Sequence, residues 1–297
     1  MLIVKVLGGL GNQMYQYALY RALLLKGFEV KLDLSAFNTY KLHNGFELES
    51  VFSLPSLICA TQKEIEKYSD QSNTIFSRIQ RKLFGLNKSH VKEELYSEVR
   101  LDKMKHVYLD GYWQSDLYFA EIAEEIRSDF IFSNSLSERN IEISEKIKIS
   151  NSVGIHIRRG DYITNQHAYN EYGRICDLAY YTEAIELIQL QINTPHFFVF
   201  SNDIEWVKHN VNFSYPVDFI SWNLAKESFV DMELMSLCKH NIIANSSFSW
   251  WGAWLNNNKD KVVLAPSRWK AGPDINKKRT PDEWQTVEVL LNEPIYN

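Results

Sequence analysis

Residues 153–162 have the sequence VGIHIRRGDY, in which an apolar stretch is followed by two arginines, a glycine and an aspartate. The apolar alternation predicts a strand over residues 152–157, whose period of two directs His156 and Arg158 to the same side. Ligands of open α/β sheets bind beyond the carboxyl ends of the strands, where the arginines are expected. Arginine binds phosphate through two parallel hydrogen bonds, so this stretch is a candidate anion site. A surface ion pair between Asp161 and one arginine is the alternative, and it leaves the strand histidine unexplained.

The C-terminal half continues with apolar runs that alternate with helical patterns, which is typical of parallel α/β units. Strands are expected at residues 152–157, 197–200, 217–220, 241–244 and 261–265, and helices at 178–190, 204–210, around 230–238, and from about 248. This half therefore reads as a doubly wound sheet of its own.

The N-terminal half begins with a predicted strand over residues 2–7, a glycine turn, and a helix with apolar residues on one face between Met14 and Leu25. A second strand is predicted over residues 28–32. The polar, serine-rich segment 133–150 is the expected boundary. The sequence thus predicts two α/β lobes, residues 1–150 and residues 151–297.

The composition is that of a globular protein, because 45% of the 297 residues are hydrophobic and 23% are charged. The net charge of −5 provides no general attraction for nucleic acid or an anionic membrane, so any bound anion must be held locally. A basic patch at Arg78, Arg81 and Lys82 is interpreted as a solvated helix face.

Targeting signals are not evident in the sequence, since no signal peptide is seen and no apolar run approaches the roughly 20 residues of a membrane span. The three cysteines lie far apart, which favours inert buried thiols in a reducing compartment. We expect a cytoplasmic protein, and a peripheral association with the membrane stays open.

The glycine turn GGLGNQM at residues 8–14 resembles a dinucleotide-binding turn, and Asp33 occupies the place of a ribose-binding acid. Met14, however, stands where that fingerprint has glycine or alanine, which argues against a nicotinamide or flavin. Asn12 as a helix N-cap would explain part of the motif. It would leave Gln13 unexplained.

The sequence FSND at residues 200–203 follows a predicted strand, and the Asp203 carboxylate could accept two N–H groups from guanine. Capping of the next helix by Ser201, Asn202 or Asp203 is the alternative. Further on, residues 244–255 read ANSSFSWWGAWL, where a strand should end and a helix begin.

The serines of this last motif would supply hydroxyls and free N–H groups at the positive end of the helix, which suits a diphosphate. Trp251, Trp254 and Leu255 share one helical face and are expected to fill the core.

The four motifs occur in the same order as in the α-1,2-fucosyltransferases of glycosyltransferase family 11, which the sequence resembles from residue 3 to about residue 270. Weaker similarity is found at residues 111–114 (GYWQ) and 266–269 (PSRW). The resemblance implies a GT-B enzyme with two Rossmann-like lobes and a cleft between them. It further implies an N-terminal acceptor lobe, a C-terminal GDP-fucose lobe, and neither metal nor other cofactor.

The resemblance also implies residue roles. Arg158 matches an arginine that holds the β-phosphate, and His156 and Asp203 match residues near guanine. Ser246 and Ser247 match a phosphate-binding helix end. The expected donor-binding residues are Gly9, Gly11, His156, Arg158, Arg159, Ser201, Asn202, Asp203, Asn245, Ser246, Ser247 and Phe248.

The implied reaction is the inverting transfer of L-fucose from GDP-β-L-fucose to the 2-hydroxyl of a terminal β-galactoside, in an O-antigen, lipopolysaccharide or oligosaccharide. Arg158 and the helix end at Ser246 would stabilise the leaving diphosphate. The base is open, because Asp161 lies among arginines and residues 163–166 lack the glutamate of some related enzymes. Asn12 could orient the acceptor or the diphosphate. A sugar-binding module without catalysis and a nicotinamide-dependent oxidoreductase are the alternatives.

Overall fold

The computed structural model describes residues 1–39, 43–69, 82, 89–93, 106–272 and 278–290. It consists of two compact units, Met1–Asn134 and Ser135–Asn297. The division lies inside the polar segment in which the boundary was expected, but it precedes helix α6 (Glu138–Ile149) instead of following it. Helix α6 belongs to the second unit because it contacts β5 and α11 of that unit. It buries Ile143 and Ile147.

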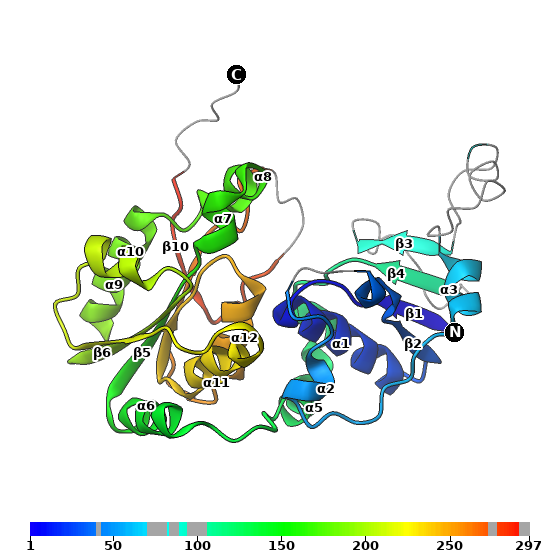
Figure 1. The fold of residues 1–297 in the computed structure, drawn as a ribbon, viewed down its shortest axis with the longest axis horizontal. Helices are drawn as coiled ribbons and strands as arrows, with labels where there is room; N and C mark the ends of the chain where they lie inside the picture. Colours follow the sequence, from blue (N-terminus) through cyan, green and yellow to red (C-terminus); the bar gives the residue numbers. More distant parts are fainter. Residues whose placement is uncertain (40–42, 70–81, 83–88, 94–105, 273–277, 291–297) are drawn as a thin grey trace. The chain divides into compact units, whose positions relative to one another are not determined.

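Unit 1 contains a parallel sheet with the strand order β2-β1-β4-β3. Its strands are β1 (Leu2–Lys5), β2 (Val30–Asp33), β3 (His90–Lys92) and β4 (Val107–Asp110). Its helical segments are α1 (Leu10–Leu25), η1 (Ser35–Asn38), α2 (Leu48–Val51), α3 (Gln62–Tyr68), η4 (Asp116–Tyr118), η5 (Ala120–Ile122) and α5 (Ala123–Asp129). The predicted strand, helix, strand order at the start of the chain is confirmed (Figure 1).

Both faces of the unit 1 sheet are covered, as is usual for parallel sheets. Ile3 and Tyr108 pack against Ile65 and Tyr68 of α3, while α1 contacts β1 and β2. The sequence analysis included Leu25 in the apolar face of α1, but Leu25 is 51% exposed because it ends the helix.

Unit 2 contains a parallel sheet with the strand order β10-β9-β8-β5-β6-β7. Its strands are β5 (Asn151–Ile157), β6 (Pro195–Ser201), β7 (Val217–Ile220), β8 (His240–Ile242), β9 (Val263–Pro266) and β10 (Gln285–Val287). Its other helical segments are α7 (Gly160–Thr164), α8 (Gln166–Ala168), η6 (Tyr169–Gly173), α9 (Leu178–Gln191), α10 (Ile204–Asn210), η7 (Ala225–Glu227), α11 (Phe229–Leu237) and α12 (Ser247–Leu255). The first strand lies in the middle, so the predicted doubly wound arrangement is confirmed.

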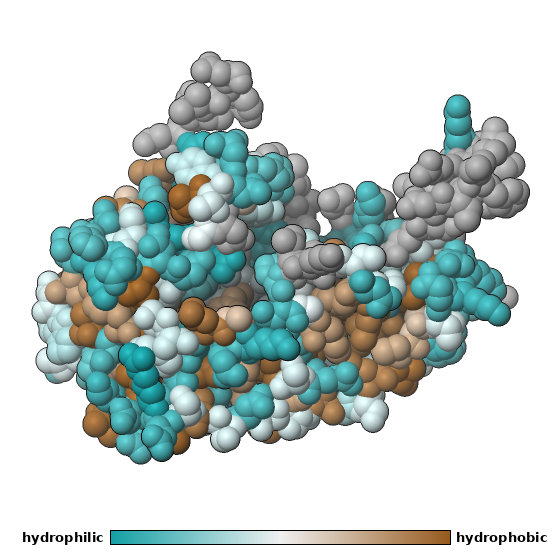
Figure 2. Space-filling model, viewed as in Figure 1, coloured by the Kyte–Doolittle hydropathy of each residue, from teal (hydrophilic) through white to brown (hydrophobic). Residues whose placement is uncertain are grey.

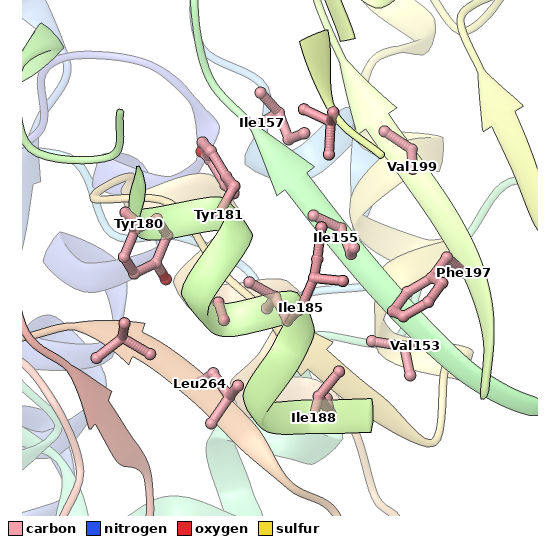
Figure 3. Packing of buried hydrophobic residues seen from close by; sticks show 14 of the residues in the cluster. Val153, Ile155, Ile157, Tyr180, Tyr181, Ile185, Ile188, Phe197, Val199 and Leu264 are labelled. Atoms are coloured by element: carbon pink, nitrogen blue, oxygen red, sulfur yellow. The ribbon is translucent and has the colours of Figure 1, made fainter. Parts of the chain in front are cut away.

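The apolar side chains of β5 alternate along the strand and enter the core of unit 2. Val153, Ile155 and Ile157 point toward α9, where they pack against Tyr181 and Ile185 (Figure 3). The intervening residues of β5, including His156, therefore face the other side of the sheet, which α11 contacts.

Helix α12 is buried on all sides. Trp250, Trp251 and Trp254 are at most 5% exposed, and the rings of Trp250 and Trp251 lie 4.9 Å apart in an edge-to-face arrangement. The core role predicted for the tryptophans is confirmed. This packing fixes the position of the helix and hence of its N-terminus.

The surface carries mixed polarity, with hydrophobic residues lying among hydrophilic ones on the face seen in Figure 2. None of the described helices is both long and apolar enough to cross a membrane. Arg78 and Arg81 of the predicted basic patch lie outside the described residues, and Lys82 is exposed.

The three cysteines are free. Cys238 is buried and Cys176 is half-buried, but the expectation of a buried thiol was wrong for Cys59, which is exposed. The reason is its position, since Cys59 forms an isolated bridge with Leu32 on the outer side of the edge strand β2.

Candidate active site

Three of the predicted motifs meet at the carboxyl edge of the unit 2 sheet. Strand β5 lies between β6 and β8, with Ile157 paired to Ser201 and Ile155 paired to Ile242. Continuing the parallel register places the segments after the three strands side by side. The strand order changes direction between β5 and β8, and open α/β sheets bind ligands at such a point.

His156 presents a buried and unsatisfied polar atom at this edge. The residue is 7% exposed, and its ring lies 5.6 Å from the ring of Phe248 at the start of α12. Its Nδ1 atom is buried without a hydrogen-bond partner. Burial, aided by the positive charge of Arg158, lowers the pKa of His156 to about 3. The imidazole is therefore neutral at pH 7 and has a nitrogen available to a ligand.

Arg158 directly follows β5. Its guanidinium lies 5.4 Å from the centre of the Tyr162 ring, and Tyr162 stacks on Tyr172 at 5.7 Å. The side chain is half-buried. An aromatic support of this kind restricts a long cationic side chain without neutralising it.

Arg159 and Asp203 bind each other. Nε of Arg159 donates to Oδ2 of Asp203 at 3.0 Å, and the guanidinium stacks 3.7 Å from the Trp206 ring centre. Oδ1 of Asp203 accepts from the Trp206 N–H at 3.3 Å, so Asp203 is the N-cap of α10. The capping interpretation of the FSND motif is thus confirmed, which leaves a role in guanine binding as a prediction.

The neighbouring polar residues of these motifs hold the edge together. Oδ1 of Asn202 accepts from the Arg159 N–H at 3.0 Å, and the hydroxyl of Ser201 accepts from the Asp203 N–H at 3.0 Å. Asp161 lies in the first turn of α7, and its side chain is outside the described part of the structure.

Asn245 is a structural tether. It is 4% exposed, and its Nδ2 group donates to the carbonyls of Tyr172 at 3.0 Å and Trp269 at 3.1 Å. Its own N–H donates to Sγ of Cys176 at 3.3 Å. The Nδ2 group is thus occupied by contacts that fix the loop before α12, and a direct contact of Asn245 with a ligand stays a prediction.

The N-terminus of α12 is open. Ser246 occupies the N-cap position but makes no side-chain capping bond. Ser246, Ser247 and Phe248 are half-buried, and each lies in the first turn or directly before it. The first N–H groups of a helix have no partner within it. This end can therefore receive an anion through N–H groups, two hydroxyls and the helix dipole.

The glycine turn of unit 1 differs in one respect from its prediction. Gly8 has a φ of 95°, and a Cβ there would lie 2.8 Å from Nδ2 of Asn12, so the position requires glycine. Gly9 is the N-cap of α1 and Gly11 is buried inside the helix. The interpretation of Asn12 as an N-cap was wrong, because the helix begins two residues earlier. Instead, Oδ1 of Asn12 accepts from Nε2 of Gln114 at 2.8 Å.

Gln13, which the sequence analysis left unexplained, and Gln16 anchor the first helix to distant segments of unit 1. The buried Gln13 donates to the Gly45 carbonyl at 2.8 Å and accepts from the Glu47 N–H at 2.9 Å. Gln16 accepts from the Leu7 N–H and donates to the Gly111 carbonyl, each at 3.0 Å. They connect the first helix to segments about 30 and 95 residues away, which no local pattern could indicate.

Asp33 is also occupied inside unit 1. It is 1% exposed, and its two oxygens accept from the Tyr108 hydroxyl at 2.6 Å and the Ser35 N–H at 2.8 Å. A ribose therefore finds no available carboxylate at the end of β2, which speaks against the oxidoreductase alternative. In the described part of the chain, no three histidine, cysteine or acidic side chains gather as a metal site would require.

Related sequences cover nearly the whole chain. It is 36% identical to an alpha-1,2-colitosyltransferase of Escherichia coli, covering 96% of this chain and 98% of the relative. It is 34% identical to the O-antigen biosynthesis glycosyltransferase WbnK of Escherichia coli, covering 93% and 97%. It is 25% identical to galactoside alpha-(1,2)-fucosyltransferase 2 of Hylobates lar, covering 88% and 71%.

Solved structures share the fold at low sequence identity. Fucosyltransferase NodZ from Bradyrhizobium superposes with a TM-score of 0.51 at 13% identity, covering 84% of this chain and 91% of that one. A variant of FUT1 from Arabidopsis thaliana in complex with GDP superposes with a TM-score of 0.51 at 12% identity, covering 90% and 71%. The predicted GT-B fold is confirmed by this likeness.

The family assignment rests on more than single relatives. Residues 1–288 match the family described as glycosyl transferase family 11, a range that includes all four motifs. The resemblance drawn from those motifs is therefore confirmed, and the chain belongs to glycosyl transferase family 11.

Proposed function

We propose that this enzyme transfers L-fucose from GDP-β-L-fucose to the 2-hydroxyl of a terminal β-galactoside, with inversion and without a metal. The observation that supports a nucleoside diphosphate donor is the edge of unit 2, where the open end of α12 adjoins the segment after β5. Arg158 supplies positive charge there, and the neutral His156 supplies a buried nitrogen for a base edge.

The proposed chemistry follows from the charge that develops. The bond between C1 of the sugar and the β-phosphate oxygen breaks, and the diphosphate leaves with the electron pair. Arg158 and the first turn of α12 stabilise that negative charge because they are fixed before the reaction begins. The acceptor oxygen attacks C1 from the opposite face, which inverts its configuration.

A second donor is supported by a specific observation, the 36% identity to an alpha-1,2-colitosyltransferase. Colitose is fucose without its 3-hydroxyl, so the two donors differ by one hydrogen-bonding group. Sites built to bind a hydroxyl discriminate strongly against the analogue that lacks it. Competition between GDP-fucose and GDP-colitose, reported as a ratio of kcat/KM, decides between them.

The experiment that tests the function is incubation with each donor and a panel of β-galactosides, followed by linkage analysis of the product. The relatives named for O-antigen biosynthesis and for galactosides make galactose-terminated glycans the first acceptors to examine. A product linked at the 2-hydroxyl of galactose supports the proposal. Binding of sugars without transfer would instead support the sugar-binding alternative.

Activity is expected to persist in excess EDTA, with kcat within about twofold of the untreated enzyme, because Arg158 and a helix end take the place of a metal. The measurement is initial rates before and after chelation and dialysis. Complete loss of transfer, restored by Mg²⁺ or Mn²⁺, would contradict metal independence.

Asp203→Ala is expected to weaken GDP binding at least ~10-fold by calorimetry, if the carboxylate accepts N–H groups of guanine. Lost hydrogen bonds to a charged acceptor cost about 1.5–3 kcal/mol each, and access of water to the site reduces this cost. UDP and ADP, which lack that pair of donors, should bind weakly to both proteins.

Asp203→Asn is the matched control, because asparagine also caps helices but has only one acceptor oxygen. Both variants should lose GDP affinity if Asp203 reads guanine. Loss of thermal stability in the alanine variant alone, with GDP affinity unchanged in both, would restrict Asp203 to its observed cap and its pair with Arg159.

A further inference from the structure

Unit 2 carries two buried amide side chains that bind each other. Asn140 lies in the first turn of α6 and Asn223 lies in the segment after β7, and they are 3% and 7% exposed. Nδ2 of Asn140 donates to Oδ1 of Asn223 at 2.9 Å, and Nδ2 of Asn223 donates to Oδ1 of Asn140 at 3.2 Å. We call these two residues the amide pair.

The other N–H groups of the amide pair are also used. Asn140 donates to the hydroxyl of Ser137 at 3.0 Å and accepts from Nε1 of Trp222 at 2.9 Å. Asn223 donates to Oδ1 of Asp231 at 2.7 Å. A reversed amide would place N–H against N–H or oxygen against oxygen, so these bonds fix the orientation of both side chains. The amide pair therefore holds Asp231 in a defined position.

Asp231 keeps an acceptor atom that the protein does not use. It lies in the first turn of α11 and is half-buried. Among the described residues, Asn223 is the only partner of its side chain, so Oδ2 accepts no hydrogen bond from them. Burial raises the pKa of the carboxyl to about 7, and the bond from Asn223 offsets this effect only in part. A ligand with further N–H groups would stabilise the charged form.

Two close contacts show which side of α11 faces the rest of unit 2. A Cβ built on Gly154 of β5 would lie 3.1 Å from Sγ of Cys238, and a Cβ built on Gly252 of α12 would lie 3.0 Å from Cβ of Met235. Asp231 precedes these two residues of α11 by seven and four positions, so it lies on the same side of the helix. Its side therefore faces β5 and α12.

The same contacts give the level of Asp231 along the sheet. Helices α11 and α12 each link two parallel strands and contact each other, so their first turns lie together at the carboxyl edge (Figure 1). Phe248 precedes Gly252 by one turn, as Asp231 precedes Met235. The ring of Phe248 lies 5.6 Å from the ring of His156. Asp231 is therefore placed at the end of the donor site where His156 lies.

Guanine has the donors that such a carboxylate can bind, since its N1–H and its 2-amino group lie side by side. Adenine and uracil lack this pair of donors. The two oxygens of Asp203 already accept from the Trp206 N–H and from Nε of Arg159. One guanine edge pairs with one carboxylate, so Asp203 and Asp231 are competing assignments for this contact.

We propose that the amide pair positions the Asp231 carboxylate to accept the N1–H and 2-amino N–H groups of the donor's guanine. Asp231 is then a donor-binding residue, and Asn140 and Asn223 are positioning residues that act through it. All three belong to unit 2. This inference rests on the proposed GDP-sugar donor.

Asp231→Asn is expected to weaken GDP binding about 10-fold or more, because the amide that replaces Oδ2 would oppose the N–H groups of guanine with its own. Asparagine keeps the size of aspartate and an acceptor for Asn223, so the fold should be retained. Inosine diphosphate lacks the 2-amino group but keeps the diphosphate. Calorimetry with both nucleotides should show that wild type prefers GDP and that this preference falls to near one in the variant.

Asn140→Ala and Asn223→Ala are expected to lower the preference for GDP over inosine diphosphate by about 2–10-fold, the equivalent of one net hydrogen bond. The reason is that the carboxylate can then turn away from the base. Asn140→Asp keeps the acceptor for Trp222 and Asn223, so it should retain more of the preference than the alanine variant.

Asn256→Ala is the matched control for loss of a buried amide. Asn256 is 2% exposed, and its Nδ2 group donates to Oδ1 of Asn241 at 2.8 Å at the C-terminal end of α12. This variant should lower the melting temperature and leave the preference for GDP at the wild-type value. A purely structural role of the amide pair would give the same result.

The outcomes that overturn the inference differ from those that overturn the proposed function. An unchanged preference in Asp231→Asn, or its loss in Asp203→Ala instead, would assign the guanine contact elsewhere. An unchanged preference in both alanine variants of the amide pair would make the pair purely structural. Wild type that binds GDP no more tightly than UDP would overturn the proposed donor and this inference together. Absence of transfer with the GDP preference intact would overturn the proposed reaction alone.

Discussion

Arg158→Lys is expected to lower kcat by about 10²–10³, the range for loss of one preorganised group that stabilises transition-state charge. Lysine keeps the positive charge but loses the planar fork that binds two phosphate oxygens. It would also lose the stacking of the guanidinium at 5.4 Å from the Tyr162 ring. Steady-state kinetics with saturating acceptor measures the effect.

The melting temperature should stay nearly unchanged, because the side chain is only half-buried and Arg159, not Arg158, forms the ion pair with Asp203. Arg139→Lys is the matched control, since its guanidinium also lies over an aromatic ring, 3.5 Å from the centre of Trp222 on the same unit. It should keep its kcat. A destabilised Arg158→Lys variant with normal specific activity would show that the arginine is structural.

The fold of unit 2 could be predicted because its strands can be recognised from short stretches of the sequence. Strand β5 places Val153, Ile155 and Ile157 in the core with α9, and strand β6 is a continuous apolar run. Helical periodicity failed at Leu25, which is 51% exposed. It is the last residue of α1, where the helical period continues in sequence but the neighbouring surface does not.

The convergence of three motifs could be predicted, but the partners of their side chains could not. Parallel strands bring their carboxyl ends to one edge, so a strand assignment is enough to group His156 with Ser246. The hydrogen bonds of Asn245 to Tyr172 and Trp269 depend on the course of loops, and loops have no sequence periodicity from which that course could be predicted.

The pH dependence of stability tests the burial of His156. Its pKa is about 3 in the folded protein, below the ordinary value of 6.5. The unfolded chain therefore binds more protons than the folded one between these values, and stability is lost as the pH falls through this window. Above pH 6.5 the group contributes no pH dependence. The loss approaches about 1.4 kcal/mol per pH unit below pH 6.5, or about 2 kcal/mol in all between pH 6.5 and pH 4.5.

Other buried groups make a comparison with a variant necessary. Burial raises the pKa of Asp231 and of Glu233 to about 7, so these carboxyls add stability as the pH falls through the same window. The pKa of His240 is lowered by burial, which acts in the same direction as His156. Wild-type stability alone therefore mixes opposing contributions, whereas the difference between wild type and a His156 variant isolates one group.

His156→Gln is expected to remove this contribution, so the free energy of unfolding of the variant should gain about 2 kcal/mol relative to wild type between pH 6.5 and pH 4.5. Urea unfolding at several pH values measures it, and His209→Gln, at an exposed site, should follow the wild type throughout. A difference between His156→Gln and wild type that does not vary with pH would mean that the folded protein holds His156 with an ordinary pKa. The imidazole beside Phe248 would then be charged in acid, and a neutral nitrogen at this edge could not be assumed for binding a guanine.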